Sequence, residues 1–313
     1  MADRATREAL GETLIELVAE GRDDIVVLDA DLAKATTTVK FAAAYPDRFF
    51  DAGIAEANMM GMAAGLAAGG KTPFTASFAV FATGRAYDQI RNSICYPNLS
   101  VKLTPTHAGI SVGPDGGSHQ MIEDIALMRV LPNMRVIVPA DFRSAKAALR
   151  IAAETPGPVY VRLGRVALPE IYGEDATFRL GHAYVLREGN DVTLAACGGM
   201  VARALQAADL LEAEGVSAEV IDVMTIKPLD VGTLLASATK TGAVVTCEEH
   251  SVIGGLGAAV AGFLVEHAPC PMERVGVRDV FGTSGDPEPL MAYFGLTAAD
   301  IADAARRVVA RAS

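Results

Sequence analysis

The stretch TREALGETLIELVAEGRDDIVVLDA (residues 6–30) joins a segment of helical periodicity to a short run of β-branched residues. The run is apolar on both of its faces, which is typical of a strand in a parallel sheet that helices cover on both sides. A second helical pattern spans 200–215. Similar β-branched runs recur at 100–105, 134–140, 158–163, 191–197, 218–223, 243–249 and 274–279. This alternation predicts an α/β fold with doubly wound, mainly parallel sheets.

The number of predicted strands is too large for one simple sheet. The segment VALPEIYGEDATFRLGHA (166–183) contains turn residues and has weak periodicity, which is typical of a linker. We therefore expect two doubly wound α/β domains, residues 1–165 and 184–313, joined by the linker 166–183.

The overall composition excludes several classes of function. The chain of 313 residues has a net charge of −11, which argues against binding to nucleic acid or to an anionic membrane. Its four cysteines form no CxxC pair, so we expect reduced thiols in a cytoplasmic protein. The N-terminal MADRATREAL is unlike a secretory signal, and no run of about 18 apolar residues predicts a membrane span.

One carboxylate stands out in the stretch FFDAGIAEANMMGMAAGLAAGG (49–70). After its aspartate the stretch has a single charged residue, Glu56, followed by glycines at 61, 65 and 69. On a helix these glycines form a smooth stripe, although each interior one costs about 1 kcal/mol relative to alanine. Two interpretations remain open. Glu56 is either the first-turn carboxylate of a buried core helix, or a carboxylate in an apolar interface that must be paired or protonated.

Two aromatic residues follow in ASFAVFATGRAYDQIRN (76–92). Phe78 and Phe81 are three residues apart, so on a helix they share one face. They are either two core residues or a flat apolar wall for a heteroaromatic ring.

The segment THAGISVGPDGGSHQ (106–120) has little with which to pack a core. It contains His107, Asp115 and His119, and the whole chain has only five histidines. Long glycine-rich loops inside compact chains are commonly functional. The two histidines are separated by twelve positions and no third ligand stands at a characteristic spacing, which disfavours a metal site. GxGxxG and Walker A motifs are also missing from the sequence.

Several stretches together resemble the C-terminal half of transketolase. They are DAGIAEANMMGMAAGLA, SFAVFATGRAYDQIRNSICYPNLSVKL, THAGISVGPDGGSHQMIEDIALMRVLPNMRVIVPAD and EEHSVIGGLGAAVAGFLVE. The resemblance implies a pyrimidine-binding domain followed by a transketolase C-terminal domain. The GDG motif with which the family binds Mg²⁺ and the diphosphate of thiamine diphosphate does not occur here. We therefore expect the smaller subunit of a split transketolase, inactive without a partner.

The resemblance assigns cofactor roles to four residues. Glu56 matches the glutamate that hydrogen-bonds the aminopyrimidine ring, and Phe78 and Phe81 match the aromatic wall beside that ring. Asp31, in LDADLAKA, matches an aspartate near the cofactor. Gly84 stands where the family often has a tyrosine, so the lining of the pyrimidine pocket departs from the pattern.

It also assigns roles at the substrate. His107 and His119 line the substrate channel, and His119 meets the reacting oxygen. Asp115 recognises the hydroxyl next to the ketose carbonyl. Arg7 and Arg165 match the two cations that bind the sugar phosphate, a role that suits the planar guanidinium.

The activity implied is transfer of a two-carbon ketol unit from a ketose phosphate to an aldose phosphate. The implied partners are an N-terminal subunit with the GDG motif and Mg²⁺, and a second copy of this chain in an α2β2 assembly. A β subunit of a 2-oxo acid dehydrogenase, half of a deoxyxylulose-phosphate synthase and a non-catalytic scaffold are the alternatives. Ala35 replaces a serine that often joins the phosphate site, which leaves the sugar open.

Overall fold

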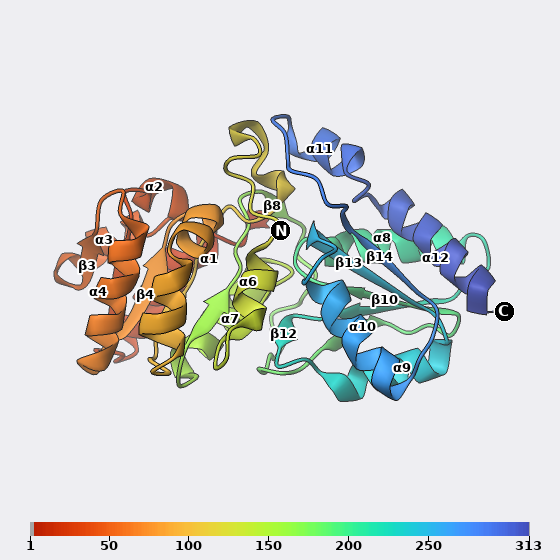
Figure 1. The fold of residues 1–313 in the computed structure, drawn as a ribbon, viewed down its shortest axis with the longest axis horizontal. Coiled ribbons are helices and arrows are strands. Elements are labelled where there is room, and N and C mark those ends of the chain that lie inside the picture. Colours follow the sequence, from red (N-terminus) through yellow and green to blue (C-terminus); the bar gives the residue numbers. More distant parts are fainter. Residues whose placement is uncertain (1–2, 313) are drawn as a thin grey trace.

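The computed structural model describes residues 3–312, which form two α/β units side by side (Figure 1). The first unit contains a seven-stranded sheet in the order β12-β6-β7-β5-β4-β2-β3. All neighbours are parallel except β12 and β6. The strands are β2 (Ile25–Asp29), β3 (Phe49–Asp51), β4 (Thr72–Ala76), β5 (Lys102–Leu103), β6 (Arg135–Ile137), β7 (Val159–Val161) and β12 (Thr225–Lys227).

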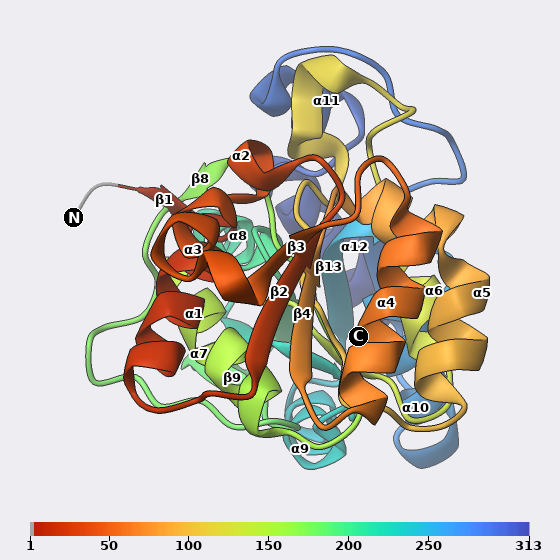
Figure 2. The same ribbon diagram turned by 90° about the vertical axis from the view of Figure 1, so that its left-hand side faces the viewer.

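Helices cover both faces of this sheet, as Figure 2 shows. One face carries α1 (Glu8–Ala19), α3 (Val39–Ala44) and α7 (Phe142–Glu154), whose apolar sides bury a common core. The opposite face carries α4 (Glu56–Ala68), α5 (Tyr87–Gln89) and α6 (Asp124–Val130). Two π-helical turns, Val80–Arg85 and Ile90–Cys95, flank α5, and the short α2 (Ala33–Thr36) follows β2.

The second unit has a five-stranded sheet in the order β14-β13-β10-β11-β9. Only β9 runs antiparallel to its neighbour. Its strands are β9 (Tyr184–Arg187), β10 (Val192–Ala196), β11 (Ala218–Asp222), β13 (Val244–Ser251) and β14 (Met272–Val277). Its helices are α8 (Met200–Glu212), α9 (Val231–Thr241), α10 (Leu256–His267), α11 (Pro287–Tyr293) and α12 (Ala298–Ala312).

The predicted fold class is confirmed, since each of the eight predicted runs overlaps a strand of a mainly parallel sheet. The central strand β4 was not predicted, because Pro73 lies inside it and proline normally avoids central strands. Along β4, the neighbouring strand β5 pairs only with Phe74 and Thr75. Pro73 therefore has no strand beside it on that side. The shortness of β5 therefore accommodates the proline.

The two units are joined by more than the predicted linker. β12 lies beyond residue 183 in the chain, yet it forms an edge of the first sheet. One apolar cluster is continuous across both units and includes Met60, Val136 and Leu256. Within the linker, β8 (Ala167–Leu168) pairs with β1 (Arg4–Ala5). The boundaries 1–165, 166–183 and 184–313 stay a prediction. Within residues 3–312, none of the helices combines the length and the apolar character needed to cross a bilayer.

A buried charged group lies where the two units meet. The Arg162 side chain is 7% exposed, and its Nε donates to Asp124 Oδ2 at 2.7 Å. Tyr160 donates its hydroxyl to the same carboxylate oxygen. A terminal Arg162 nitrogen donates to the carbonyl oxygens of Met121 at 3.2 Å and Glu249 at 3.0 Å. Arg162 thus connects β7 in the first unit to β13 in the second.

Replacing this arginine is expected to destabilise the chain. R162M leaves the Asp124 carboxylate buried without a cation, so the free energy of unfolding should fall by about 3 kcal/mol or more. The matched variant R306M removes a cation that pairs with Glu214 at the surface, and it should cost about 1 kcal/mol or less. Urea unfolding of both variants checks this. Equal stability of R162M and the unmodified chain would contradict it.

Candidate active site

Glu56 is the first residue of α4 and its side chain is 2% exposed. Its carboxylate is paired, because Arg85 donates to Glu56 Oε2 at 3.0 Å. The helix it begins is not a fully buried core helix, since Gly61 and Gly65 are exposed and no atom lies within 4 Å of where their Cβ atoms would be. Glu56 is therefore a buried, ion-paired carboxylate on a helix with an open glycine face.

Sequence reasoning missed Arg85, the partner of Glu56. Arg85 ends the π-helical turn Val80–Arg85, whose wider winding changes which residues share a face. Its guanidinium lies 4.6 Å from the ring centre of Phe81 while it reaches the Glu56 carboxylate. The preceding Gly84 is exposed. A π-helical turn has no simple sequence signature, so helical spacing alone did not single out this arginine.

Four predicted site residues form one cluster of rings. The Phe78 and Phe81 rings are parallel, with centres 6.1 Å apart. His107 also stacks on Phe78, with the two ring centres 3.8 Å apart. His119 meets Phe81 edge-on at 5.2 Å. Phe78 is buried and Phe81 is only half-buried, so the cluster presents part of an aromatic surface to solvent.

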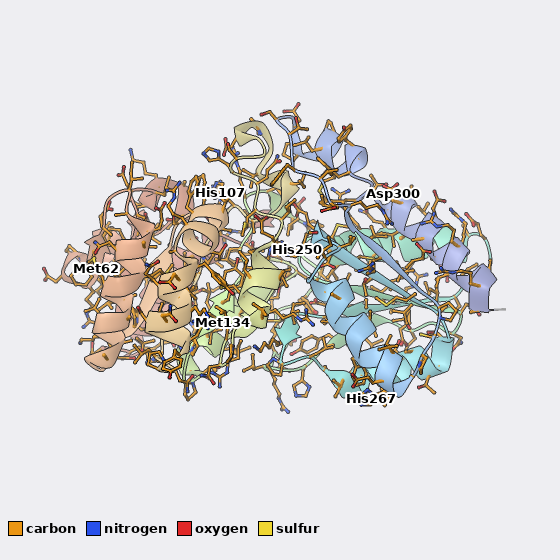
Figure 3. The ribbon with its side chains drawn as sticks, in the orientation of Figure 1. Met62, His107, Met134, His250, His267 and Asp300 are labelled. Atoms are coloured by element: carbon orange, nitrogen blue, oxygen red, sulfur yellow. The ribbon has the colours of Figure 1, made fainter. Side chains whose placement is uncertain are left out.

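The contacts of His107 identify its tautomer. His107 follows β5 and has φ +59°, and Figure 3 shows it in the upper part of the first unit. Arg7 lies 3.2 Å from Nε2, and because a guanidinium only donates, Nε2 must accept. The proton is then on Nδ1, which donates to the Thr106 hydroxyl at 2.7 Å. Burial, with the nearby charges of Arg7 and Arg165, lowers the pKa of His107 to about 3. The imidazole is therefore neutral at physiological pH.

The other polar residues of the loop are more exposed. His119 is half-buried, and its Nδ1 lies 2.9 Å from the Ser118 hydroxyl. Asp115 is exposed and pairs with Arg165 at 3.3 Å. The loop projects above the sheets, beside the segment that precedes α11, in both Figure 1 and Figure 2.

Arg7 and Arg165 lie close enough for their charges to interact. Burial and the charge of Arg165 lower the pKa of Arg7. Within residues 3–312, Arg7 makes no ion pair: it donates to the Ala35 carbonyl oxygen at 3.0 Å and to His107, and its buried Nε has no partner. Two neighbouring guanidinium groups with an unused donor form a suitable site for an anion.

Within residues 3–312, no hydrogen bond or ion pair joins Asp31 to the ring cluster. Asp31 is exposed with φ +61°, and its N–H donates to Asp51 at 3.0 Å. The adjacent buried carboxylate of Asp29, which sequence reasoning did not single out, organises the turn, and burial raises its pKa. Its oxygens accept from Leu32 N, Thr36 Oγ1 and Thr38 Oγ1. This turn places the Ala35 carbonyl against Arg7. Across residues 3–312, no group of three His, Cys, Asp or Glu side chains has a metal-binding arrangement.

Comparison with protein families gives two matches that together cover most of the chain. Residues 2–170 match the transketolase pyrimidine binding domain, and residues 181–301 match the transketolase C-terminal domain.

Individual relatives match over nearly their full length. The chain is 49% identical to a putative transketolase C-terminal section of Methanocaldococcus jannaschii, covering 96% of this chain and 94% of that protein. It is 48% identical to the 6-deoxy-6-sulfo-D-fructose transketolase subunit SqwH of a Clostridium species, covering 96% and 95%. A solved structure described as a split gene transketolase, inactive beta4 tetramer, is 54% identical with a TM-score of 0.90 and covers 99% of both chains.

The pKa of His107 predicts how stability depends on pH. As pH falls below about 6.5, the unfolded chain binds a proton at His107, whereas the folded chain does not until about pH 3. Stability is therefore lost on acidification, by about 2 kcal/mol between pH 7.5 and pH 5 from this residue. Urea unfolding of H107N should show a loss smaller by that amount.

The exposed His267 provides the matched control, since H267N should follow the pH dependence of the unmodified chain. An H107N variant that loses as much stability on acidification as the unmodified chain would show that the buried imidazole is not the source.

Proposed function

The chain belongs to the transketolase family, and we propose that it is the small subunit of a split, thiamine diphosphate-dependent transketolase that moves a two-carbon ketol unit between sugars. The observation that carries the proposal is the buried Glu56 carboxylate together with the ring cluster of Phe78, Phe81, His107 and His119. The relatives that are named as transketolase subunits of similar length support the division of the enzyme between two chains.

The donor set of this site fits the pyrimidine end of thiamine diphosphate. Glu56 is a buried carboxylate able to hydrogen-bond a ring nitrogen, and Phe78 and Phe81 offer parallel apolar faces to a flat ring. When bound, the cofactor supplies the nucleophilic carbon and the electron sink for cleavage of the carbon–carbon bond. Glu56 would hold a proton at the ring nitrogen, and Arg85 would hold the carboxylate in place through its bond to Oε2. Asp31 remains a proposed cofactor neighbour only through the family resemblance.

We assign the diphosphate and Mg²⁺ to the partner. Residues 3–312 bring no group of carboxylates, histidines or cysteines together for a metal, and the GDG motif is not in the sequence. A GDG-bearing subunit is the proposed partner, in an α2β2 assembly. The relative described as a beta4 tetramer supports self-association of such chains.

The substrate would lie between the ring cluster and the two arginines. Arg7 and Arg165 would bind the terminal anion of the sugar, and the neutral His107 would keep its Nε2 lone pair turned to Arg7. His119 and Asp115 would meet the hydroxyls near the reacting carbon. Phosphate and sulfonate are both tetrahedral anions, and one relative is named for a sulfonated sugar. We further propose a role with pentose phosphates and the domain division 1–165 and 184–313. We also propose a cytoplasmic location, which the four free cysteines support.

Activity should require the partner and Glu56. The chain mixed with thiamine diphosphate, Mg²⁺ and a ketose phosphate should show no turnover until a GDG-bearing subunit is added. In the assembled enzyme E56Q should lower kcat by about 10²–10⁴-fold, since loss of a general acid–base group has that cost. A coupled assay of the released aldose measures both effects, with pyruvate as the control donor. Turnover by the chain alone, or full activity of E56Q, would refute the proposal.

The arginines should govern the charged end of the donor. R7M and R165M should each raise KM for a phosphorylated ketose by about tenfold or more, because one charge-assisted hydrogen bond is worth about 1.5–3 kcal/mol. KM for a neutral ketose of the same length should change little. R187M, which removes a surface cation paired with Asp209, serves as the control. Steady-state kinetics with phosphorylated, sulfonated and neutral donors measures whether the rise in KM is specific to charged donors. An equal rise in KM for all donors would argue against an anion site.

A further inference from the structure

The C-terminal unit packs directly on the loop that carries Asp115 and His119. A Cβ atom at Gly117 would overlap the carbonyl oxygen of Gly282, and one at Gly116 would lie 2.5 Å from the Ser284 hydroxyl. The loop and the segment before α11 therefore meet backbone to backbone, which agrees with their adjacent ribbons in Figures 1 and 2.

Gln120 connects this contact to both parts of the loop. Its amide nitrogen donates to the carbonyl oxygens of Ile110 at 3.1 Å, Gly113 at 3.3 Å and Thr283 at 2.9 Å. One buried side chain thus binds the start of the loop, its middle and the C-terminal unit.

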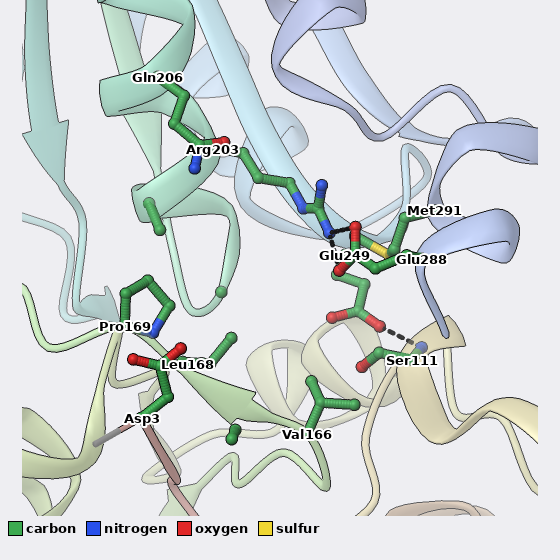
Figure 4. Close-up of a pocket in the computed structure, with 13 residues that line it drawn as sticks. Asp3, Ser111, Val166, Leu168, Pro169, Arg203, Gln206, Glu249, Glu288 and Met291 are labelled. Carbon is green, nitrogen blue, oxygen red and sulfur yellow. Dashed lines mark hydrogen bonds and ion pairs between the residues drawn. The ribbon is translucent and has the colours of Figure 1, made fainter. Parts of the chain in front are cut away.

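Glu249, near the end of β13, makes the second connection. Its carboxylate accepts the backbone N–H of Ser111 at 2.6 Å (Figure 4). The carbonyl oxygen of Glu249 accepts from Arg162. A Cβ atom at Gly109 would overlap the same carboxylate, so the loop backbone approaches Glu249 closely at two positions. One residue later, the Val112 carbonyl oxygen accepts from Arg165 at 2.5 Å. The backbone at 111–112 is therefore bound both by Glu249 and by a proposed phosphate-binding arginine.

A cavity beside Ser111 makes the Glu249 bond important. The cavity has a volume of about 260 Å³ and is lined by Glu249, Ser111, Arg203 and Glu288 (Figure 4). Arg203 is engaged with both carboxylate oxygens of Glu288, at 2.8 and 2.9 Å. Protein atoms do not fill the space beside Ser111, so the loop has fewer packing contacts on this side. The hydrogen bond to Glu249 takes the place of those contacts.

We propose that Glu249 is a positioning residue: its carboxylate fixes the loop backbone at Ser111 and so holds Asp115 and His119 toward the sugar. The C-terminal unit then takes part in substrate binding without contacting the substrate. The expected effect on substrate binding rests on the transketolase function proposed above. The expected effect on the loop backbone concerns this chain alone.

The structural part is tested on the isolated chain by hydrogen–deuterium exchange of residues 109–120. E249A should accelerate exchange of these amides about tenfold or more, while the amides of β10 and β11 stay unchanged. E288A, which alters another carboxylate of the same cavity, should leave the loop as in the unmodified chain. Unchanged exchange in E249A overturns the proposal, whatever the activity of the enzyme.

Two conservative variants separate positioning from charge. E249Q retains an oxygen that can accept the Ser111 N–H, whereas E249D keeps the charge but is one methylene shorter. In the assembled enzyme, E249D should raise KM for the ketose donor about tenfold and leave half-saturation by thiamine diphosphate unchanged, and E249Q should recover most of the loss. A larger rise in KM for E249Q than for E249D would overturn the proposal. An unmodified complex without turnover would instead count against the proposed function, while the exchange result would still decide the role of Glu249.

Discussion

The arrangement of the site depends on one buried cation, Arg162. Its guanidinium is paired with Asp124 and donates to the carbonyl oxygens of Met121, directly after the loop, and of Glu249 in β13. A charge so deeply buried is tolerated only when it is paired and its donors are used, so these groups have little freedom to separate. The two sheets, and with them Glu249 and the loop that follows Thr106, are thereby fixed in one relative position.

The parallel sheet explains why distant residues converge. Phe78 follows β4, His107 follows β5 and Arg165 follows β7, and these three strands are neighbours in the order β7-β5-β4. The carboxyl ends of parallel strands open at one edge of a sheet, where ligands of such folds commonly bind. The isolated bridge between Phe78 and Thr106 brings the aromatic wall and the histidine together at that edge.

Local patterns in the sequence were sufficient for the fold class, and they singled out several candidate site residues, whereas Asp31, Arg7 and Arg165 came only from the family resemblance. The apolar runs have the character of doubly covered strands, and Glu56, Phe78 and the loop histidines stand in stretches of unusual composition. The sequence did not predict Arg85 as a site residue, because a π-helical turn brings it to Glu56. The sequence did not predict a role for Glu249, because its partner Ser111 lies 138 positions away in the chain and no local pattern encodes such a pairing.

The edge strand β12 has a consequence for recombination between related chains. Because β12 comes from beyond the linker and pairs with β6, a crossover within residues 166–183 would join the first sheet of one parent to an edge strand of the other. The strand pairing of Thr225 with Ile137 would then have to form between residues from two different parents. The two halves therefore constrain each other's sequence and cannot be exchanged as independent modules, even though each contains a sheet of its own.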